Sequence, residues 1–318
     1  MKSTLFATTE TNFLPPIGYN KILDNISNLV KSQKLPSSNI IYAPEGSGKR
    51  LFCEYIASII LEAENSSYSK IDMHPDLLII DNKDQTSSKK EITVDLTRKI
   101  KDFIHLTPSQ ANAQVIIIDS IDKLNKNAAN SILKILEEPP KNRYFLLICH
   151  NLSTILDTIK SRCNKVKLPA LSKQDFFEII SLNEDIDISK DDLELLYKIF
   201  PEQPGIAISF IENKGIETFQ AIQDINNSTS NNLFLEIKKF SNEYDWKNIE
   251  LFNNFFTIIN HLIYQKVIFF NEKQNHSNVE KLQKLNFRIQ KDFFDTVNLN
   301  LDRKNYVITV LQDLSNFR

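Results

Sequence analysis

Glycine, cysteine and histidine are scarce in this chain of 318 residues, which has five glycines, three cysteines and five histidines. The cysteines (Cys53, Cys149 and Cys163) lie far apart, so they offer neither a disulfide framework nor a paired set of zinc ligands. No histidine lies four residues from another, the spacing that places two metal ligands on one helix face. We therefore expect reduced thiols and no metal site built by the protein.

The chain also lacks an excess of either charge and a long apolar run. It has 38 Lys and Arg against 40 Asp and Glu, a net charge of -2, so no overall positive field draws the isolated protein to DNA. Residues 1–13 lack the apolar core of a signal peptide, and the apolar stretch at residues 255–270 is broken by polar residues. We expect a cytoplasmic protein without membrane contact, whose nucleic-acid role is local or supplied by partners.

The composition is otherwise that of a folded protein. The chain has 42% apolar and 25% charged residues, which excludes a mainly disordered or fibrous protein. The length exceeds what one hydrophobic core usually serves, so two or three domains are expected.

The first half alternates short apolar strands with amphipathic helices, the pattern of a parallel sheet covered on both faces. The predicted strands are rich in Ile, Leu and Val and lie at residues 39–42, 77–81, 115–119, 144–149 and 166–168. The helices between them are predicted at residues 22–32, 49–64, 95–106 and 126–138. The sequence therefore predicts an α/β fold for this half.

Beyond the fifth strand the chain reads as helices. A boundary is expected near Pro169, and the Asn- and Ser-rich run at residues 226–232 is the best second linker. The predicted division is an α/β part at residues 1–168, a small helical part at 169–225 and a second helical part at 226–318.

The last part carries an apolar stripe with helical spacing, formed by Phe252, Phe255, Phe256, Ile259 and Ile263. Two interpretations remain open at this point. The stripe is either the core of this part or a subunit interface.

Two of the five glycines, Gly46 and Gly48, lie in the segment APEGSGKR at residues 43–50, between a predicted strand and a predicted helix. In this context the backbone N–H groups around Gly46, Ser47 and Gly48 can converge on phosphate oxygens, and Lys49 adds a point charge. The segment therefore predicts a phosphate-binding loop, and the alternative is a tight turn that caps a helix.

The loop departs from the motif GxxxxGK[ST] at two positions. Ala43 replaces the first glycine, and Arg50 stands where a Ser or Thr hydroxyl holds magnesium. A guanidinium carries only donors and cannot ligate a cation. Arg50 therefore argues against ordinary ATP hydrolysis at this loop.

The strand predicted at residues 115–119 ends in Asp119. In many ATPases an acid at the end of such a strand contacts magnesium through its carboxylate. The next residue in an ATPase is often a Glu that prepares the attacking water, but here it is Ser120, which is no general base near neutral pH. The water-activating function is therefore predicted to be lost, while Asp119 can still orient the loop.

Two further motifs are the run VIIIDSIDKLNKNAANSILKILEEPP at residues 115–140 and the triplet Ser161-Arg162-Cys163. Together with the phosphate loop they resemble the clamp-loader branch of the AAA+ superfamily, and the pattern is closest to delta-prime subunits of bacterial DNA polymerase III. The resemblance covers about residues 15–225. It implies an AAA+ P-loop-like core with a parallel sheet, a small helical lid domain and an all-α collar domain for the three predicted parts.

The resemblance also implies roles for single residues. In this family the arginine of the Ser-Arg-Cys triplet is an arginine finger that reaches the ATP of a neighbouring subunit, a role that falls on Arg162. The alternative is that Arg162 forms a surface ion pair. Ile206 stands where hydrolysing relatives carry a sensor arginine, and residues 54–148 contain no cysteine for the zinc module of many relatives.

By this resemblance the chain is a non-hydrolysing, stator-like subunit of the DNA polymerase III clamp loader, with Arg162 acting in trans. Gly46, Ser47, Gly48, Lys49, Arg50 and Asp119 would then form a degenerate nucleotide site with weak or no binding and no cofactor. The implied partners are gamma or tau and delta in a hetero-oligomer, and indirectly the sliding clamp and primed DNA. The alternatives are a self-sufficient tau- or gamma-like ATPase and an interaction protein that kept only the fold.

Overall fold

The computed structural model describes residues 14–62, 71–81, 94–183, 186–228 and 232–317. Contacts divide the chain into two compact units: Met1–Asp185 with Pro201–Gly205, and Ile186–Phe200 with Ile206–Arg318. We call them the sheet unit and the helical unit. The expectation for the N-terminal 13 residues, and the last two residues of the helix predicted to end at Glu64, lie outside the described residues. The division into three domains stays a prediction.

The sheet unit contains one parallel sheet with the strand order β2-β3-β4-β1-β5. Its strands are β1 (Ser38–Tyr42), β2 (Leu77–Ile80), β3 (Gln114–Ile118), β4 (Arg143–Cys149) and β5 (Asn164–Lys167). Every predicted strand is present, with each end within two residues of its predicted position. The α/β expectation for the first half is therefore confirmed.

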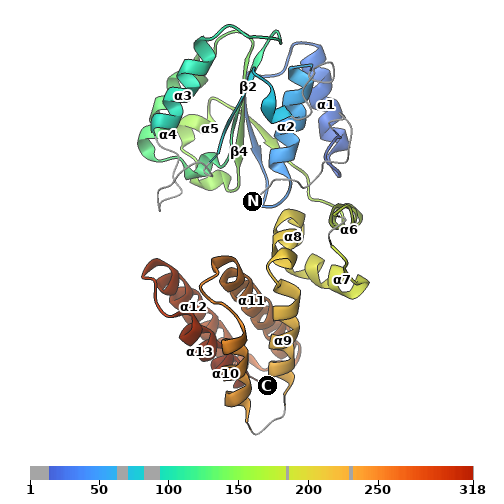
Figure 1. Ribbon diagram of the computed structural model, residues 1–318, viewed down its shortest axis with the longest axis vertical. Coiled ribbons are helices and arrows are strands. Elements are labelled where there is room, and N and C mark those ends of the chain that lie inside the picture. Colours follow the sequence, from blue (N-terminus) through green and yellow to red (C-terminus); the bar gives the residue numbers. More distant parts are fainter. Residues whose placement is uncertain (1–13, 63–70, 82–93, 184–185, 229–231, 318) are drawn as a thin grey trace. The chain divides into compact units, whose positions relative to one another are not determined.

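Helices cover both faces of this sheet, as Figure 1 shows, with α1 and α2 on one face and α3, α4 and α5 on the other. Successive strand residues alternate between the two cores: Ile41 and Ile117 pack toward α1 and α2, whereas Ile40 and Ile116 pack toward the other helices. The helices of this unit are α1 (Asn20–Lys31), α2 (Lys49–Ile60), α3 (Val94–His105), α4 (Lys126–Glu137), α5 (Asp157–Lys160) and α6 (Lys173–Ser181), with 3-10 turns η2 (Ile71–Met73), η4 (Ile121–Lys123) and η5 (Leu152–Thr154).

The buried carboxylate of Asp76 holds the loop that precedes β3. Asp76, which is 1% exposed, precedes β2 and accepts hydrogen bonds from the backbone N–H groups of Ser109 (2.6 Å), Gln110 (2.8 Å) and Ala111 (2.9 Å). Burial would raise the pKa of Asp76, but these backbone donors lower it below the usual value. The loop that leads into β3 therefore depends on this one side chain.

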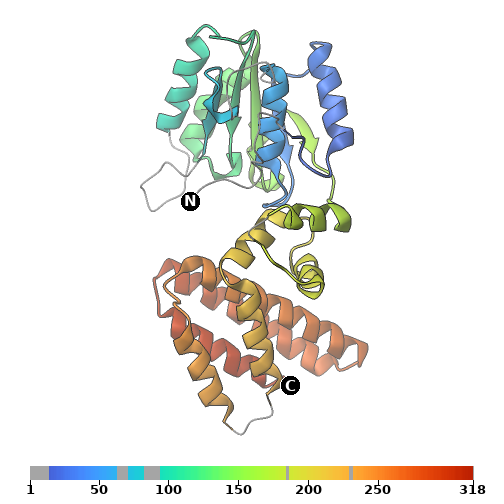
Figure 2. The same ribbon diagram turned by 45° about the vertical axis from the view of Figure 1, so that its right-hand side comes forward.

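The described residues of the helical unit form helices, which Figure 2 shows in a second view. They are α7 (Lys190–Ile199), most of α8 (Pro204–Glu212), α9 (Gly215–Asn227), α10 (Leu233–Glu243), α11 (Ile249–Glu272), α12 (His276–Asn298) and α13 (Arg303–Ser315). None of the helices in the described ranges is long and apolar enough to cross a membrane.

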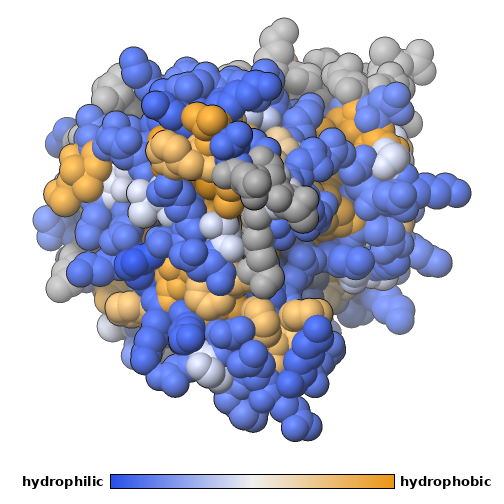
Figure 3. All heavy atoms as spheres, turned by 90° about the horizontal axis from the view of Figure 1, so that it is seen from below, coloured by the Kyte–Doolittle hydropathy of each residue, from blue (hydrophilic) through white to orange (hydrophobic). Residues whose placement is uncertain are grey.

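The apolar stripe on α11 forms the core of the helical unit. Phe252, Phe255 and Ile259 are fully buried, and Phe256 stacks on Phe293 of α12 with ring centroids 3.8 Å apart. The interpretation of the stripe as a core is confirmed, so it is not a free interface. On the face shown in Figure 3, exposed apolar residues form separate patches among hydrophilic ones.

Candidate functional site

The predicted phosphate loop and Asp119 meet at the carboxyl edge of the sheet. The loop follows β1, Asp81 follows β2, Asp119 follows β3 and His150 follows β4. Parallel strands bring all their carboxyl ends to one edge, where ligands bind in open α/β sheets. Distant sequence segments therefore converge on one site.

Two groups outside the phosphate loop hold its backbone. The Tyr19 hydroxyl donates to the Ser47 carbonyl oxygen (2.6 Å), and the Gly205 N–H donates to the Gly46 carbonyl oxygen (2.9 Å). Burial raises the pKa of Tyr19 to about 12, so the phenol remains a donor at neutral pH. Gly48 precedes α2 with φ +83°, a conformation that favours glycine. A Cβ on Gly205 would lie 3.0 Å from the Gly46 oxygen, so glycine permits this close approach.

Lys49 is engaged by its own loop. Its side chain is buried, and Nζ donates to the carbonyl oxygens of Ala43 (2.9 Å) and Pro44 (2.5 Å). Burial lowers the pKa of Lys49 to about 8, so the ammonium form still prevails at pH 7. Its charge stabilises the loop itself.

Arg50 lies among three carboxylates. Its Nε donates to Glu54 Oε1 (2.5 Å), and its Nη1 lies 3.3 Å from Asp119 Oδ2 and 3.8 Å from Asp81 Oδ2. Burial alone would lower the pKa of Arg50, but the charge and hydrogen bond of Glu54, followed by Asp119 and Asp81, raise it. The guanidinium is therefore permanently charged and bound to the acidic side of the pocket.

Ser120 and His150 lie beside Asp119 at the carboxyl edge of the sheet. Ser120 Oγ donates to Asp119 Oδ1 (3.2 Å) and lies 3.0 Å from His150 Nε2. Burial, and then the charge of Lys49, lowers the pKa of His150, so the imidazole is neutral at pH 7. The His150 backbone N–H donates to Asp122 Oδ1 (3.3 Å). The Ser120 hydroxyl thus positions the Asp119 carboxylate and the His150 imidazole.

The side chains that would contact a magnesium nucleotide here are engaged with partners within the protein. Lys49 donates to its own loop, and the guanidinium of Arg50 occupies Asp119, the residue expected to face magnesium. Ser47 Oγ is buried and lacks a hydrogen-bond partner among the described residues, so one donor toward phosphate remains. Both cationic side chains of the loop are thus paired within the protein.

Arg162 lies in the sheet unit between α5 and β5, away from contact with the loop residues named above. Its Nε donates to Glu137 Oε1 (2.7 Å), its Nη2 donates to the same oxygen, and its Nη1 donates to the Thr158 carbonyl oxygen (2.7 Å). The Arg162 and Glu137 side chains are 32% and 44% exposed. An ion pair this exposed contributes only about 0–1 kcal/mol, so the guanidinium can exchange Glu137 for another anion at low cost.

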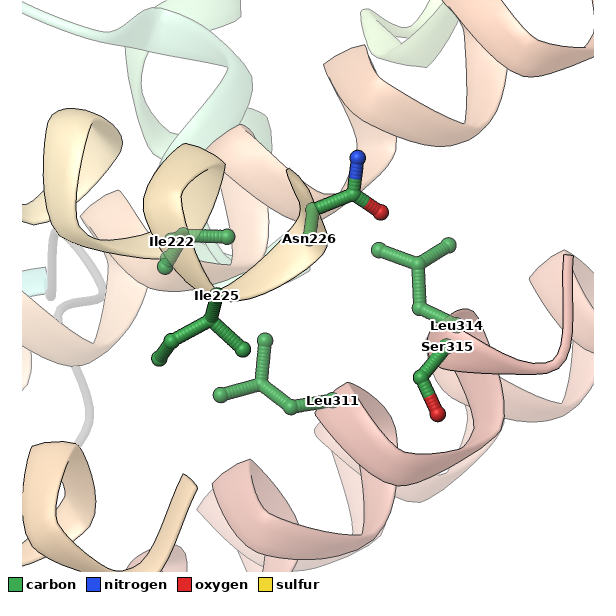
Figure 4. Close-up of a pocket in the computed structure, with 6 residues that line it drawn as sticks. All are labelled: Ile222, Ile225, Asn226, Leu311, Leu314 and Ser315. Carbon is green, nitrogen blue, oxygen red and sulfur yellow. The ribbon is translucent and has the colours of Figure 1, made fainter. Parts of the chain in front are cut away.

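Other candidate sites are weaker. Among the residues that the structure describes, no group of three or more His, Cys, Asp or Glu side chains could hold a metal ion. A recess between α9 and α13, lined by the residues labelled in Figure 4, has a volume of about 10 Å³, the room of one water molecule. It is too small for a nucleotide.

Sequence reasoning missed several residues of the site. Glu54 lies four residues after Arg50 on α2, and this helical spacing could have revealed the pair. Asp81 could have been placed by its position after a strand of the same sheet. Tyr19 and Gly205 contact the loop from distant segments, and no local signal marks them.

Comparison with known proteins finds matches to subunits of DNA polymerase III. Residues 18–172 match the family described as DNA polymerase III, delta subunit. The delta-prime subunit of Pseudomonas aeruginosa is 32% identical over 141 residues, which are 41% of this chain and 42% of that protein. The delta-prime subunit of Buchnera aphidicola is 33% identical over 143 residues, 44% of this chain and 41% of that protein. The aligned part thus spans less than half of either relative.

The fold has a counterpart among solved structures. A gamma subunit-related protein of DNA polymerase III from Thermotoga maritima superimposes with a TM-score of 0.51 and 17% identity, covering 93% of this chain and 99% of that chain. At this identity the likeness concerns the fold alone: a parallel five-stranded α/β domain followed by helices. Residues 18–172, just under half of this chain, are thus similar to the DNA polymerase III delta-prime family, in the clamp-loader branch of AAA+ proteins.

Proposed function

We propose that this chain is the delta-prime subunit of a bacterial clamp loader, a stator-like arm that hydrolyses no ATP and supplies Arg162 in trans to a neighbouring subunit. The observation that carries the proposal is the exposed guanidinium of Arg162, held by Glu137 and one backbone carbonyl. A planar, permanently charged fork on the surface can neutralise charge on a phosphoryl group held by another subunit.

The pocket of this chain supports the non-hydrolysing half of the proposal. Hydrolysis needs a cation on the phosphates and a group that prepares water. Here Arg50 pairs with Asp119, and Ser120 takes the place of the usual Glu. Carboxylates thus engage Arg50 where a cation would bind, which disfavours the alternative of a self-sufficient tau- or gamma-like ATPase.

The proposed partners are gamma or tau and delta, with the helical unit contributing to a collar. Because the stripe on α11 is interior, the collar contact would use other surfaces, such as the exposed Phe287 and Phe294 of α12. The proposal places the protein in the cytoplasm and leaves contact with the sliding clamp and primed DNA to the assembled loader.

Co-purification tests the proposal. The full chain is co-expressed with the gamma or tau and delta subunits of the same organism, and the complex is isolated through a tag on delta. We expect this chain to elute with the others as one assembly on size exclusion. Elution of this chain alone, while the other subunits assemble with one another, would show that it is no loader subunit.

A further inference from the structure

Arg50 forms more ion pairs than a single surface salt bridge. It contacts three carboxylates from three different elements: Glu54 from α2, Asp81 at the end of β2 and Asp119 at the end of β3. The Arg50 side chain is 30% exposed and its partners are 22–25% exposed. Asp81 and Asp119 both approach Nη1, whereas Glu54 binds Nε, so the guanidinium lies between the carboxylates.

That position corresponds to the magnesium in a working phosphate loop. The residue after the loop lysine ordinarily supplies a hydroxyl to magnesium, and the acid at the end of the third strand supplies a carboxylate. Here the first residue is Arg50 and the second is Asp119, and they bind each other (3.3 Å). One positive group therefore replaces both the ligand and the ion.

We infer that Arg50 is a built-in cation that takes the place of magnesium, so that Glu54, Asp81 and Asp119 are held together without nucleotide or metal. A guanidinium is permanently charged and supplies directed donors to Glu54, Asp81 and Asp119 without a bound ion. A magnesium ion would arrive and leave with nucleotide, whereas Arg50 cannot leave. The inference gives a physical reason why the proposed stator needs no magnesium at this site, and it rests on the proposed function only in treating the site as non-hydrolytic.

The test restores the hydroxyl of the motif. In the full-length Arg50→Thr variant the three carboxylates lose their cation, and Mg²⁺ can bind one or two of them while keeping several waters. We expect Mg²⁺ to raise the melting temperature of this variant by about 3–5 °C once its concentration exceeds Kd about tenfold, relative to NaCl of equal ionic strength. The wild-type chain should show no such difference.

Three control variants test whether the Mg²⁺ response comes from the carboxylates around Arg50. Arg50→Lys keeps a cation and should remain indifferent to Mg²⁺. Adding Asp119→Asn to Arg50→Thr should abolish the Mg²⁺ response. Arg288→Thr removes an arginine that pairs with Asp313 in the helical unit, and should gain no response.

Two results would overturn the inference: a Mg²⁺ response of the wild-type chain equal to that of Arg50→Thr, or no response in folded Arg50→Thr. If Arg50→Thr folds only when Mg²⁺ is present, the inference is supported, and if Mg²⁺ fails to rescue folding, it is contradicted. All these measurements use the chain without loader partners. A failure here therefore differs from a failure of co-purification, which concerns assembly.

Discussion

Replacing Arg162 with alanine in the assembled loader should slow ATP hydrolysis at the adjoining subunit by about a thousandfold, the contribution of an arginine finger in other phosphoryl-transfer systems. Arg162→Lys should recover little, because an ammonium lacks the planar fork of donors. Pre-steady-state hydrolysis by a loader in which only the adjoining subunit is competent measures this step directly. Assembly should be unchanged, because the pair with Glu137 is exposed and weak.

An arginine elsewhere in the sheet unit provides the matched control. Arg98 lies exposed on α3, and Arg98→Ala should leave hydrolysis unchanged. If Arg162→Ala also hydrolyses ATP at the wild-type rate in a complete assembly, then Arg162 is only a surface ion pair, and the proposed role in trans is wrong.

Removing the Asp76 carboxylate should destabilise the sheet unit by about 1.5–3 kcal/mol, because three backbone N–H groups lose a charged acceptor. Hydrogen exchange of β3 and β4 in Asp76→Ala measures the effect. The fluorescence of Trp246, the single tryptophan of the chain, reports the helical unit separately. Asp102→Ala, at an exposed position on α3, should change stability by less than about 0.5 kcal/mol.

The same side chain predicts a pH dependence. Because the pKa of Asp76 is lowered on folding, its stabilisation is fully present above its unfolded pKa of about 4 and is lost as the pH falls through the lower folded value. Urea titrations from pH 7 to pH 3 should show a smaller loss of stability in Asp76→Ala than in the wild type. Parallel losses in both proteins would mean that another group carries the acid sensitivity.

Much of the sheet unit follows from local sequence. Runs of Ile, Leu and Val predicted β1 to β4, because a strand buried on both faces requires continuous apolar residues, whereas β5 at the edge of the sheet reads NKVK and is largely exposed. The helix predicted from Lys49 ends at Ile60, earlier than expected, and Glu62 then adopts a left-handed conformation (φ 51°). Spacing alone could not locate that end, since apolar residues continue to Leu61.

The chemistry of the site was less accessible to sequence. Arg50 could be recognised as a loss of magnesium binding, but its gain of Asp81 and Asp119 as partners depends on how the strands are ordered. The pairing of Arg162 with Glu137 spans 25 residues and depends on where α4 ends. Such contacts arise from tertiary packing, which leaves no periodic signal in the chain.

Equilibrium dialysis of the isolated full-length chain against Mg-ATP tests the central claim most directly: the pocket beside Lys49 serves no nucleotide of its own. We predict no saturable binding below about 1 mM and no turnover above the buffer blank. Micromolar affinity, with hydrolysis that Lys49→Ala abolishes, would contradict the account and identify the chain as an ATPase in its own right.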